Sequence, residues 1–129
     1  LSDRHGRDVP FCYNRKEAKA HGEGGVLVGA PLAGRVLVID DVITAGTAVR
    51  EVIGMVADAG AELAGVAIGL NRQERGAGSL SAIQEIEQQH GIPVLSIVDM
   101  SHIIDYLEAE GGPEGALAAM REYREKYGV

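Results

Sequence analysis

The stretch Arg35–Arg50, RVLVIDDVITAGTAVR, decides the fold of this chain. It opens with the apolar run Val36–Ile39, which is typical of a buried strand. Two adjacent carboxylates, Asp40 and Asp41, come next, and a loop of small and hydroxyl-bearing residues leads into helical spacing from Thr47. The stretch therefore predicts a strand, a tight turn and a helix N-terminus. Backbone N–H groups at such a terminus lack intrahelical partners, so the turn is a site for an anion such as phosphate.

Alternating strand-like and helix-like segments surround this stretch. The expected strands are Val9–Tyr13, Arg35–Asp40, Leu63–Asn71 and Val94–Val98, with a further short strand or arm at Val26–Leu32. The expected helices are Thr47–Ala59, Leu80–His90, Ser101–Ala109, whose N-cap would be Ser101, and Glu114–Lys126. This order predicts an α/β fold, a single domain over residues 1–129 in which helices flank a parallel sheet. The second strand is apolar on both faces, so we expect it at the centre of the sheet.

The composition argues against several classes of protein. The chain has 129 residues, enough for one core, and its net charge of −7 disfavours a general nucleic-acid or anionic-membrane surface. It lacks the long apolar run of a transmembrane helix, and its N-terminus has no signal-peptide pattern. Together with a single cysteine, these features favour a cytoplasmic protein.

Two features predict that the chain is an N-terminally incomplete fragment. It begins with Leu1 rather than Met, and a strand-like segment follows almost at once. Four strands also make a small sheet around a strand that is expected at its centre.

Residues 14–25, NRKEAKAHGEGG, have no apolar periodicity and carry a cluster of cations. By itself this segment reads as an ordinary solvated linker. In a chain of net charge −7, however, three cations within five residues favour a mobile lid that grips an anion. Arg15, Lys16 and Lys19 suit a pyrophosphate, since charge-assisted hydrogen bonds to phosphate oxygens are short and strong. His21 could donate to the same group, although a lone histidine in a loop is also unremarkable.

Polar groups follow three of the predicted strands, namely Asn14–Lys16, the Asp40–Asp41 pair and Arg72. Because ligands bind outside the carboxyl ends of parallel strands, we expect these groups to share one site. Adjacent acids at a strand end suit sugar hydroxyls or a cation near pyrophosphate, and one of the two could be structural, since their side chains point to opposite sides. Arg72 offers a fork that matches a carboxylate. The alternatives are a hydrated strand end for the acids, a helix cap for Thr44 or Thr47, and a surface position for Arg72.

The acid pair followed by V-I-T-A-G-T resembles the phosphoribosyl-pyrophosphate (PRPP) motif of type I phosphoribosyltransferases. Three further segments, NRKEAKAHGEGG, RQERG with SAIQE downstream, and YREKYGV, are similar to the orotate phosphoribosyltransferases within that family. The resemblance covers essentially the whole chain. It implies a Mg²⁺-dependent transfer in which N1 of orotate attacks C1 of PRPP, giving orotidine 5′-phosphate and pyrophosphate in pyrimidine biosynthesis.

The resemblance also implies roles for individual residues. It places the ribose 5-phosphate and its hydroxyls against Asp40, Asp41, Val42, Ile43, Thr44, Ala45, Gly46, Thr47 and Ala48. It places pyrophosphate against Arg15, Lys16, Lys19 and His21, on a catalytic loop shared across a homodimer interface. Orotate would contact Thr44 and Arg72, and the catalytic candidates are Lys19 and Asp41. No protein metal site is expected, because Mg²⁺ would be held mainly by PRPP and water.

The chain departs from this family at its N-terminus. Family members are longer there, with a core strand that carries a second pyrophosphate loop and a further part that forms a hood over orotate. The expected fold is thus the family core without that strand and hood. Two other interpretations stay open: a non-catalytic PRPP-binding or dimerising fragment, and a phosphoribosyltransferase for another base. Arg72 disfavours a purine, which has no carboxylate for it to meet.

Overall fold

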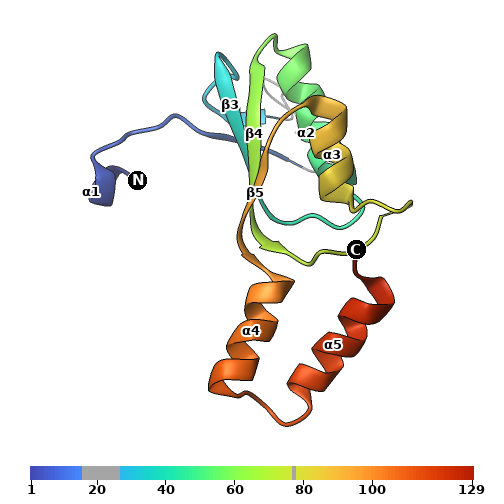
Figure 1. The fold of residues 1–129 in the computed structure, drawn as a ribbon. Helices are drawn as coiled ribbons and strands as arrows, with labels where there is room; N and C mark the ends of the chain where they lie inside the picture. The colour runs from blue at the N-terminus through green and yellow to red at the C-terminus, as the bar shows by residue number, and fades with distance from the viewer. Residues whose placement is uncertain (16–26, 77) are drawn as a thin grey trace.

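The computed structural model describes residues 1–15, 27–76 and 78–129, and it confirms an α/β fold with a parallel sheet and flanking helices (Figure 1). The strands are β1 (Cys12–Asn14), β2 (Leu27–Gly29), β3 (Arg35–Val42), β4 (Glu62–Asn71) and β5 (Val94–Asp99). The helices are α1 (Ser2–His5), α2 (Thr47–Asp58), α3 (Ala82–His90), α4 (Met100–Glu110) and α5 (Ala116–Tyr127). None of the described helices is long and apolar enough to cross a bilayer.

The main sheet has three parallel strands in the order β3-β4-β5. The central strand is therefore β4, and the expectation that the Arg35 strand lies at the centre is wrong for the described part of the chain. An apolar pattern on both faces of β3 could not distinguish a covered face from an uncovered one. Two glycines of β4 lie close to backbone on either side of it: a Cβ on Gly65 would lie 3.0 Å from the carbonyl oxygen of Pro93, and one on Gly69 would lie 3.1 Å from that of Asp41.

One face of the sheet is buried under α2 and α3, which lie on the same side of it (Figure 1). The core there combines strand residues with the apolar stripes of both helices: Val38, Ile43, Val49, Ile53, Val66, Ile68, Ala82, Ile83 and Ile86. Ile68 and Ile86 are almost completely buried, so β4 and α3 meet at the middle of this core. Burial of this kind is the main source of stability in a small α/β layer.

The opposite face of the sheet is apolar and exposed. Leu37 and Ile39 of β3 are 54% and 78% exposed, and Leu95 and Ile97 of β5 are 64% and 82% exposed. The register places Ile39 beside Ala67, and Ala67 beside Leu95, so the two outer strands form one surface across β4. We call these four residues, Leu37, Ile39, Leu95 and Ile97, the open sheet face.

The first predicted strand does not join this sheet. Strand β1 pairs antiparallel with β2 in a separate two-stranded sheet, so its expected place in the parallel sheet is wrong. Gly29 makes this pairing possible: its φ is 117°, and a Cβ there would lie 2.4 Å from the carbonyl oxygen of Phe11. The partner of a short apolar run depends on a segment more than ten residues away, which a local pattern does not reveal. The predicted arm at Val26–Leu32 supplies that partner.

Helix boundaries lie within two residues of expectation, but the N-cap of α4 differs from the predicted one. Strand β5 runs one residue further than predicted, and Asp99 rather than Ser101 is the N-cap. The Asp99 side chain accepts a hydrogen bond of 3.0 Å from the backbone N–H of His102. Ser101 lies in the first turn of the helix instead, where its hydroxyl donates to Gln73 Oε1 at 3.0 Å. Helices α4 and α5 pair beyond the carboxyl end of the sheet (Figure 1).

Candidate functional site

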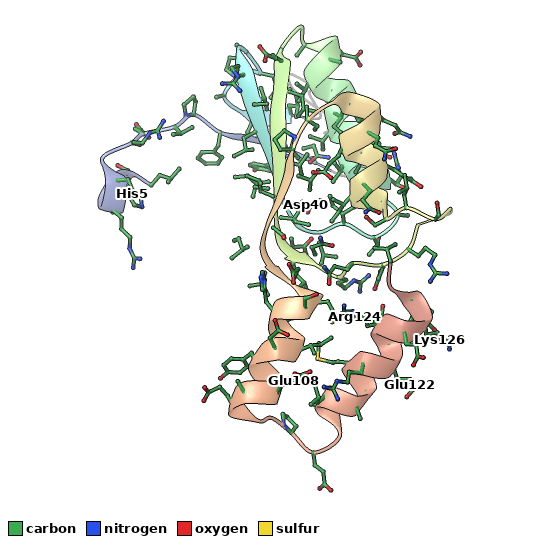
Figure 2. All side chains as sticks on the ribbon, in the orientation of Figure 1. His5, Asp40, Glu108, Glu122, Arg124 and Lys126 are labelled. Atoms are coloured by element: carbon green, nitrogen blue, oxygen red, sulfur yellow. The ribbon has the colours of Figure 1, made fainter. Side chains whose placement is uncertain are left out.

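The two adjacent acids lie inside β3, near its carboxyl end, and do not follow it, because the strand continues to Val42. Asp40 is half-buried on the side of the sheet that carries α2 and α3, and Asp41 is exposed on the side of the open sheet face. The Asp41 N–H donates to Asp40 Oδ1 at 2.9 Å, and the Val42 N–H donates to Asp41 Oδ1 at 2.7 Å. Each carboxylate therefore keeps its second oxygen for a ligand, and Asp40 lies at the carboxyl end of the sheet (Figure 2).

The turn after β3 is anchored on one side and open on the other. Ile43 is 7% exposed and belongs to the core, whereas Thr44, Ala45 and Thr47 are exposed. Gly46 is the N-cap of α2 with a φ of 77°, and no side chain caps the helix. The first-turn N–H groups of α2 thus have no side-chain acceptor, at the positive end of the helix dipole. This geometry suits a phosphate group.

Arg50, which was not among the residues expected at the site, holds this turn in place. Arg50 Nη1 donates to the carbonyl oxygen of Ala45 at 2.7 Å, and its Nη2 pairs with Glu85 Oε2 of α3 at 2.9 Å. A Cβ on Gly46 would lie 2.8 Å from that same Nη1, so a side chain at this position would displace the end of Arg50. The available signal was a basic residue one helical turn after the loop, but its partner Glu85 is 35 residues away.

Arg72 follows β4 and is held by an acid two residues later. Its Nη2 pairs with Glu74 Oε2 at 2.9 Å, and the two side chains are 33% and 19% exposed. The Arg72 Nε is buried and has no hydrogen-bond partner in the described part of the chain. The hydroxyl of Tyr123 in α5 donates to the other oxygen, Glu74 Oε1, and this hydrogen bond raises the pKa of Tyr123. The sequence reading singled out Arg72 but missed Glu74 and Tyr123.

Two of the three expected polar groups come together. The acid pair and the Thr44–Thr47 turn follow β3, and Arg72 follows β4, its parallel neighbour, with Val42 beside Leu70 in the register. The third group does not follow a strand of the main sheet, because Arg15 follows β1, which belongs to the separate two-stranded sheet. The other lid candidates, Lys16, Lys19 and His21, lie outside the described residues, as does the rest of the proposed loop from residue 16 to residue 25.

No three His, Cys, Asp or Glu side chains gather into a potential metal site in residues 1–15, 27–76 and 78–129. The acids nearest the turn are the Asp40–Asp41 pair, whose side chains alternate across the strand. The described residues thus contain carboxylate oxygens for a hydrated cation but no set of ligands that encloses one.

The structure has a parallel α/β sheet with an acid pair and an uncapped turn after one strand, which is the arrangement that the resemblance to type I phosphoribosyltransferases predicts. The solved structure of orotate phosphoribosyltransferase from Francisella tularensis matches the whole chain with a TM-score of 0.80 and 37% identity, and the match covers 61% of that protein. The Mycobacterium tuberculosis enzyme in complex with PRPP matches 76% of this chain, with a TM-score of 0.59 and 27% identity, over 52% of its own length.

Curated sequences give the same result. Orotate phosphoribosyltransferases from Cellvibrio japonicus and Saccharophagus degradans are 63% and 60% identical to this chain over all 129 of its residues. The chain spans 60% of the length of these two relatives. No family model matches the chain. The resemblance read from the sequence is confirmed, and the chain is homologous over its full length to orotate phosphoribosyltransferases.

Proposed function

We propose that this chain carries the catalytic core of an orotate phosphoribosyltransferase. The reaction transfers the ribose 5-phosphate of PRPP to orotate and yields orotidine 5′-phosphate and pyrophosphate, a step of pyrimidine biosynthesis. The observation that carries the proposal is the uncapped turn beside the Asp40–Asp41 pair, which lies at the same carboxyl end of the sheet as Arg72. The names of the relatives support the choice of orotate as the base.

The turn would hold the 5-phosphate. The N–H groups from Thr44 to Ala48 surround the start of α2, and the hydroxyls of Thr44 and Thr47 are exposed beside them. Val42 and Ile43 would contribute backbone, with the Ile43 side chain anchored in the core. The second carboxylate oxygens of Asp40 and Asp41 would accept hydrogen bonds from the ribose hydroxyls.

Orotate would lie between the turn and Arg72. The guanidinium group presents planar N–H donors that match the carboxylate of orotate, and Thr44 would contact the ring. N1 of orotate forms the new bond to C1 of the ribose as the bond from C1 to the pyrophosphate oxygen breaks, and the proton on N1 passes to the leaving pyrophosphate or to water. Asp41, on the exposed side of β3, would stabilise positive charge that develops on the ribose in this step.

Mg²⁺ fits the described residues only as an ion bound through the substrate. The Asp40–Asp41 pair offers oxygens within reach of a hydrated cation, but no enclosing set of ligands accompanies it. PRPP and water would therefore supply most of the coordination, and the ion would neutralise charge on the leaving pyrophosphate.

The pyrophosphate contacts are assigned from the sequence. Arg15 is the described member of this group, and Lys16, Lys19 and His21 complete it. We propose that Lys19 donates to the leaving pyrophosphate from a loop shared between the subunits of a homodimer, in a cytoplasmic enzyme. A Lys19→Ala variant that keeps PRPP affinity but loses turnover would support this role, and one with full activity would contradict it.

Formation of orotidine 5′-phosphate from PRPP, Mg²⁺ and orotate tests the function directly. Turnover with orotate, and none with uracil or a purine base, is the expected result. Binding of PRPP without turnover would instead favour a non-catalytic PRPP-binding protein. Turnover with another base but not with orotate would contradict the role of Arg72.

A further inference from the structure

The segment that carries Arg72 is fixed in an uncommon backbone conformation. Gln73 has a φ of 54°, which residues other than Gly, Asn and Asp seldom adopt. Its N–H donates to Asn71 Oδ1 at 2.8 Å, and its side-chain Oε1 accepts from the Ser101 hydroxyl of α4 at 3.0 Å. Its carbonyl oxygen accepts from the N–H of Val129 at 3.0 Å. The turn after Arg72 is thus determined by contacts from two other parts of the chain.

The end of the chain forms a second set of contacts with this segment. Arg75 N–H donates to the carbonyl oxygen of Tyr127 at 2.8 Å, and Arg75 Nη2 donates to the carbonyl oxygen of Gly128 at 3.0 Å. Glu74 and Gly128 form an antiparallel bridge. The residues that follow β4 and the residues that end α5 therefore lie side by side, although they are more than fifty positions apart in the sequence.

Glu74 links this C-terminal segment to Arg72 through its two oxygens. One oxygen pairs with Arg72 Nη2 and the other accepts from the Tyr123 hydroxyl. The buried Arg72 Nε has no partner in the described part of the chain, so Glu74 is the only acceptor there that the structure gives this guanidinium. A partly buried arginine that loses its acceptor is poorly compensated and tends to move toward water.

We propose that Glu74 and Tyr123 are positioning residues, which hold the Arg72 guanidinium at the sheet edge so that its remaining donors face the carboxylate of the base. This inference rests on the proposed function, because it takes Arg72 as the group that meets orotate. It adds that α5 sets the selectivity for a base that bears a carboxylate, although this helix does not come directly after a strand of the sheet. Tyr123 acts through Glu74, and neither residue touches substrate.

Two opposing effects decide what Glu74 does for an anionic ligand. Its negative charge weakens the attraction of Arg72 for a carboxylate, whereas its hydrogen bond restricts the orientation of the guanidinium. A Tyr123→Phe variant separates them, because it removes the hydrogen bond on Glu74 and leaves the charge in place. If orientation is the larger effect, Tyr123→Phe and Glu74→Gln both weaken orotate binding. If charge is the larger effect, Glu74→Gln strengthens it, and this result would overturn the positioning role.

The test compares the affinities of the full-length protein for orotate, for uracil, which lacks the carboxylate, and for PRPP with Mg²⁺, by titration calorimetry. We expect Tyr123→Phe to weaken orotate binding about fivefold, as for one lost hydrogen bond, with the affinities for uracil and PRPP unchanged. In turnover, KM for orotate rises by the same factor while kcat and KM for PRPP stay constant. Tyr127→Phe is the matched control, since its ring packs on Tyr123 with centroids 4.8 Å apart but its hydroxyl does not contact Glu74.

The outcomes separate this inference from the function on which it rests. Orotate affinity in Tyr123→Phe and Glu74→Gln equal to that of the unaltered chain would overturn the positioning role and leave the function intact. A parallel fall in PRPP affinity would also overturn it, because it would show general damage to the fold. An unaltered full-length protein that binds PRPP but not orotate would overturn the proposed function and the inference together.

Discussion

At the scale of single residues, Gly46 is the position where the anion site depends most directly on backbone geometry. Its φ of 77° lies in the left-handed region, and the space beside it is filled by Arg50 and Ile86. Any side chain there would both strain the backbone and push Arg50 away from the Ala45 carbonyl. The turn therefore favours glycine chiefly because of its backbone conformation, and the contact with Arg50 adds to this preference.

We expect Gly46→Ala to lower the free energy of unfolding by about 1–2 kcal/mol and to weaken PRPP binding. Urea denaturation and a PRPP titration measure the two effects. The matched control is Gly54→Ala in the middle of α2, where nothing lies within 4 Å of the added Cβ and φ is not positive. That change should raise stability by about 0.5–1 kcal/mol. Equal stability of the two variants would contradict the steric argument.

Arg50 gives a second prediction at this scale. Arg50→Met removes the hydrogen bond to the Ala45 carbonyl and the part-buried pair with Glu85. We expect a loss of about 1 kcal/mol in unfolding free energy and weaker PRPP binding, because the turn is no longer fixed to α3. Arg35→Met is the control, since its pair with Glu62 is 3.7 Å long and 74% and 71% exposed. It should change neither quantity measurably.

At the scale of elements, α5 is attached to the site segment through Tyr123, and this contact titrates. The hydrogen bond to Glu74 raises the pKa of Tyr123 above its usual value of 10.0. The contribution of this contact to stability is therefore complete below pH 10 and disappears as the pH rises through the higher pKa of the folded state. Well below pH 10 the Tyr123 hydroxyl stays protonated, so its ionisation does not change the contact.

The corresponding measurement is the thermal unfolding of the chain and of Tyr123→Phe between pH 8 and pH 11. We expect the chain to melt at a higher temperature than the variant up to about pH 10, and the difference to shrink above it. Tyr127→Phe again serves as the control. Its difference in melting temperature from the unaltered chain should not shrink above pH 10. A gap between the chain and Tyr123→Phe that stays constant to pH 11 would show that the hydroxyl makes no titrating contact.

At the scale of the whole molecule, the described residues cover one face of the sheet and leave the other exposed. The open sheet face presents four large apolar side chains at alternate positions of two outer strands. Contiguous exposed apolar surface of this kind favours association with other apolar surfaces. The 129-residue chain should thus associate with itself or bind an apolar dye at this face.

Ile97→Thr tests that expectation, because Ile97 is 82% exposed. We expect the variant to bind less apolar dye and to associate less in sedimentation experiments, with unfolding free energy changed by less than about 0.5 kcal/mol. Val38→Thr is the comparison on the covered face, where the side chain is 7% exposed. A buried hydroxyl there should cost about 1–3 kcal/mol and leave dye binding to the native state unchanged. Undiminished association of Ile97→Thr would place the association surface elsewhere.

Local patterns predicted much of the secondary structure but little of the pairing. The spacing around Thr47 and the glycines after α2 and α3 located those helices to within two residues, since caps and periodicity are properties of neighbouring residues. The place of β3 in the sheet, the partner of β1 and the cap of α4 were wrong. Each of these depends on what a second segment does, and the same apolar strand can lie at an edge or in the centre.

The sequence by itself determined the strand, acid pair, turn and helix that suit a phosphate, because the order of small, acidic and apolar residues fixes this local geometry. It also indicated Arg72 and the family resemblance. Only the tertiary structure decided that Arg50 supports the turn through Glu85, and that Tyr123 reaches Glu74 beside Arg72. Those contacts join residues 35 and 49 positions apart, and folding of the sheet and helices brings them within hydrogen-bond distance.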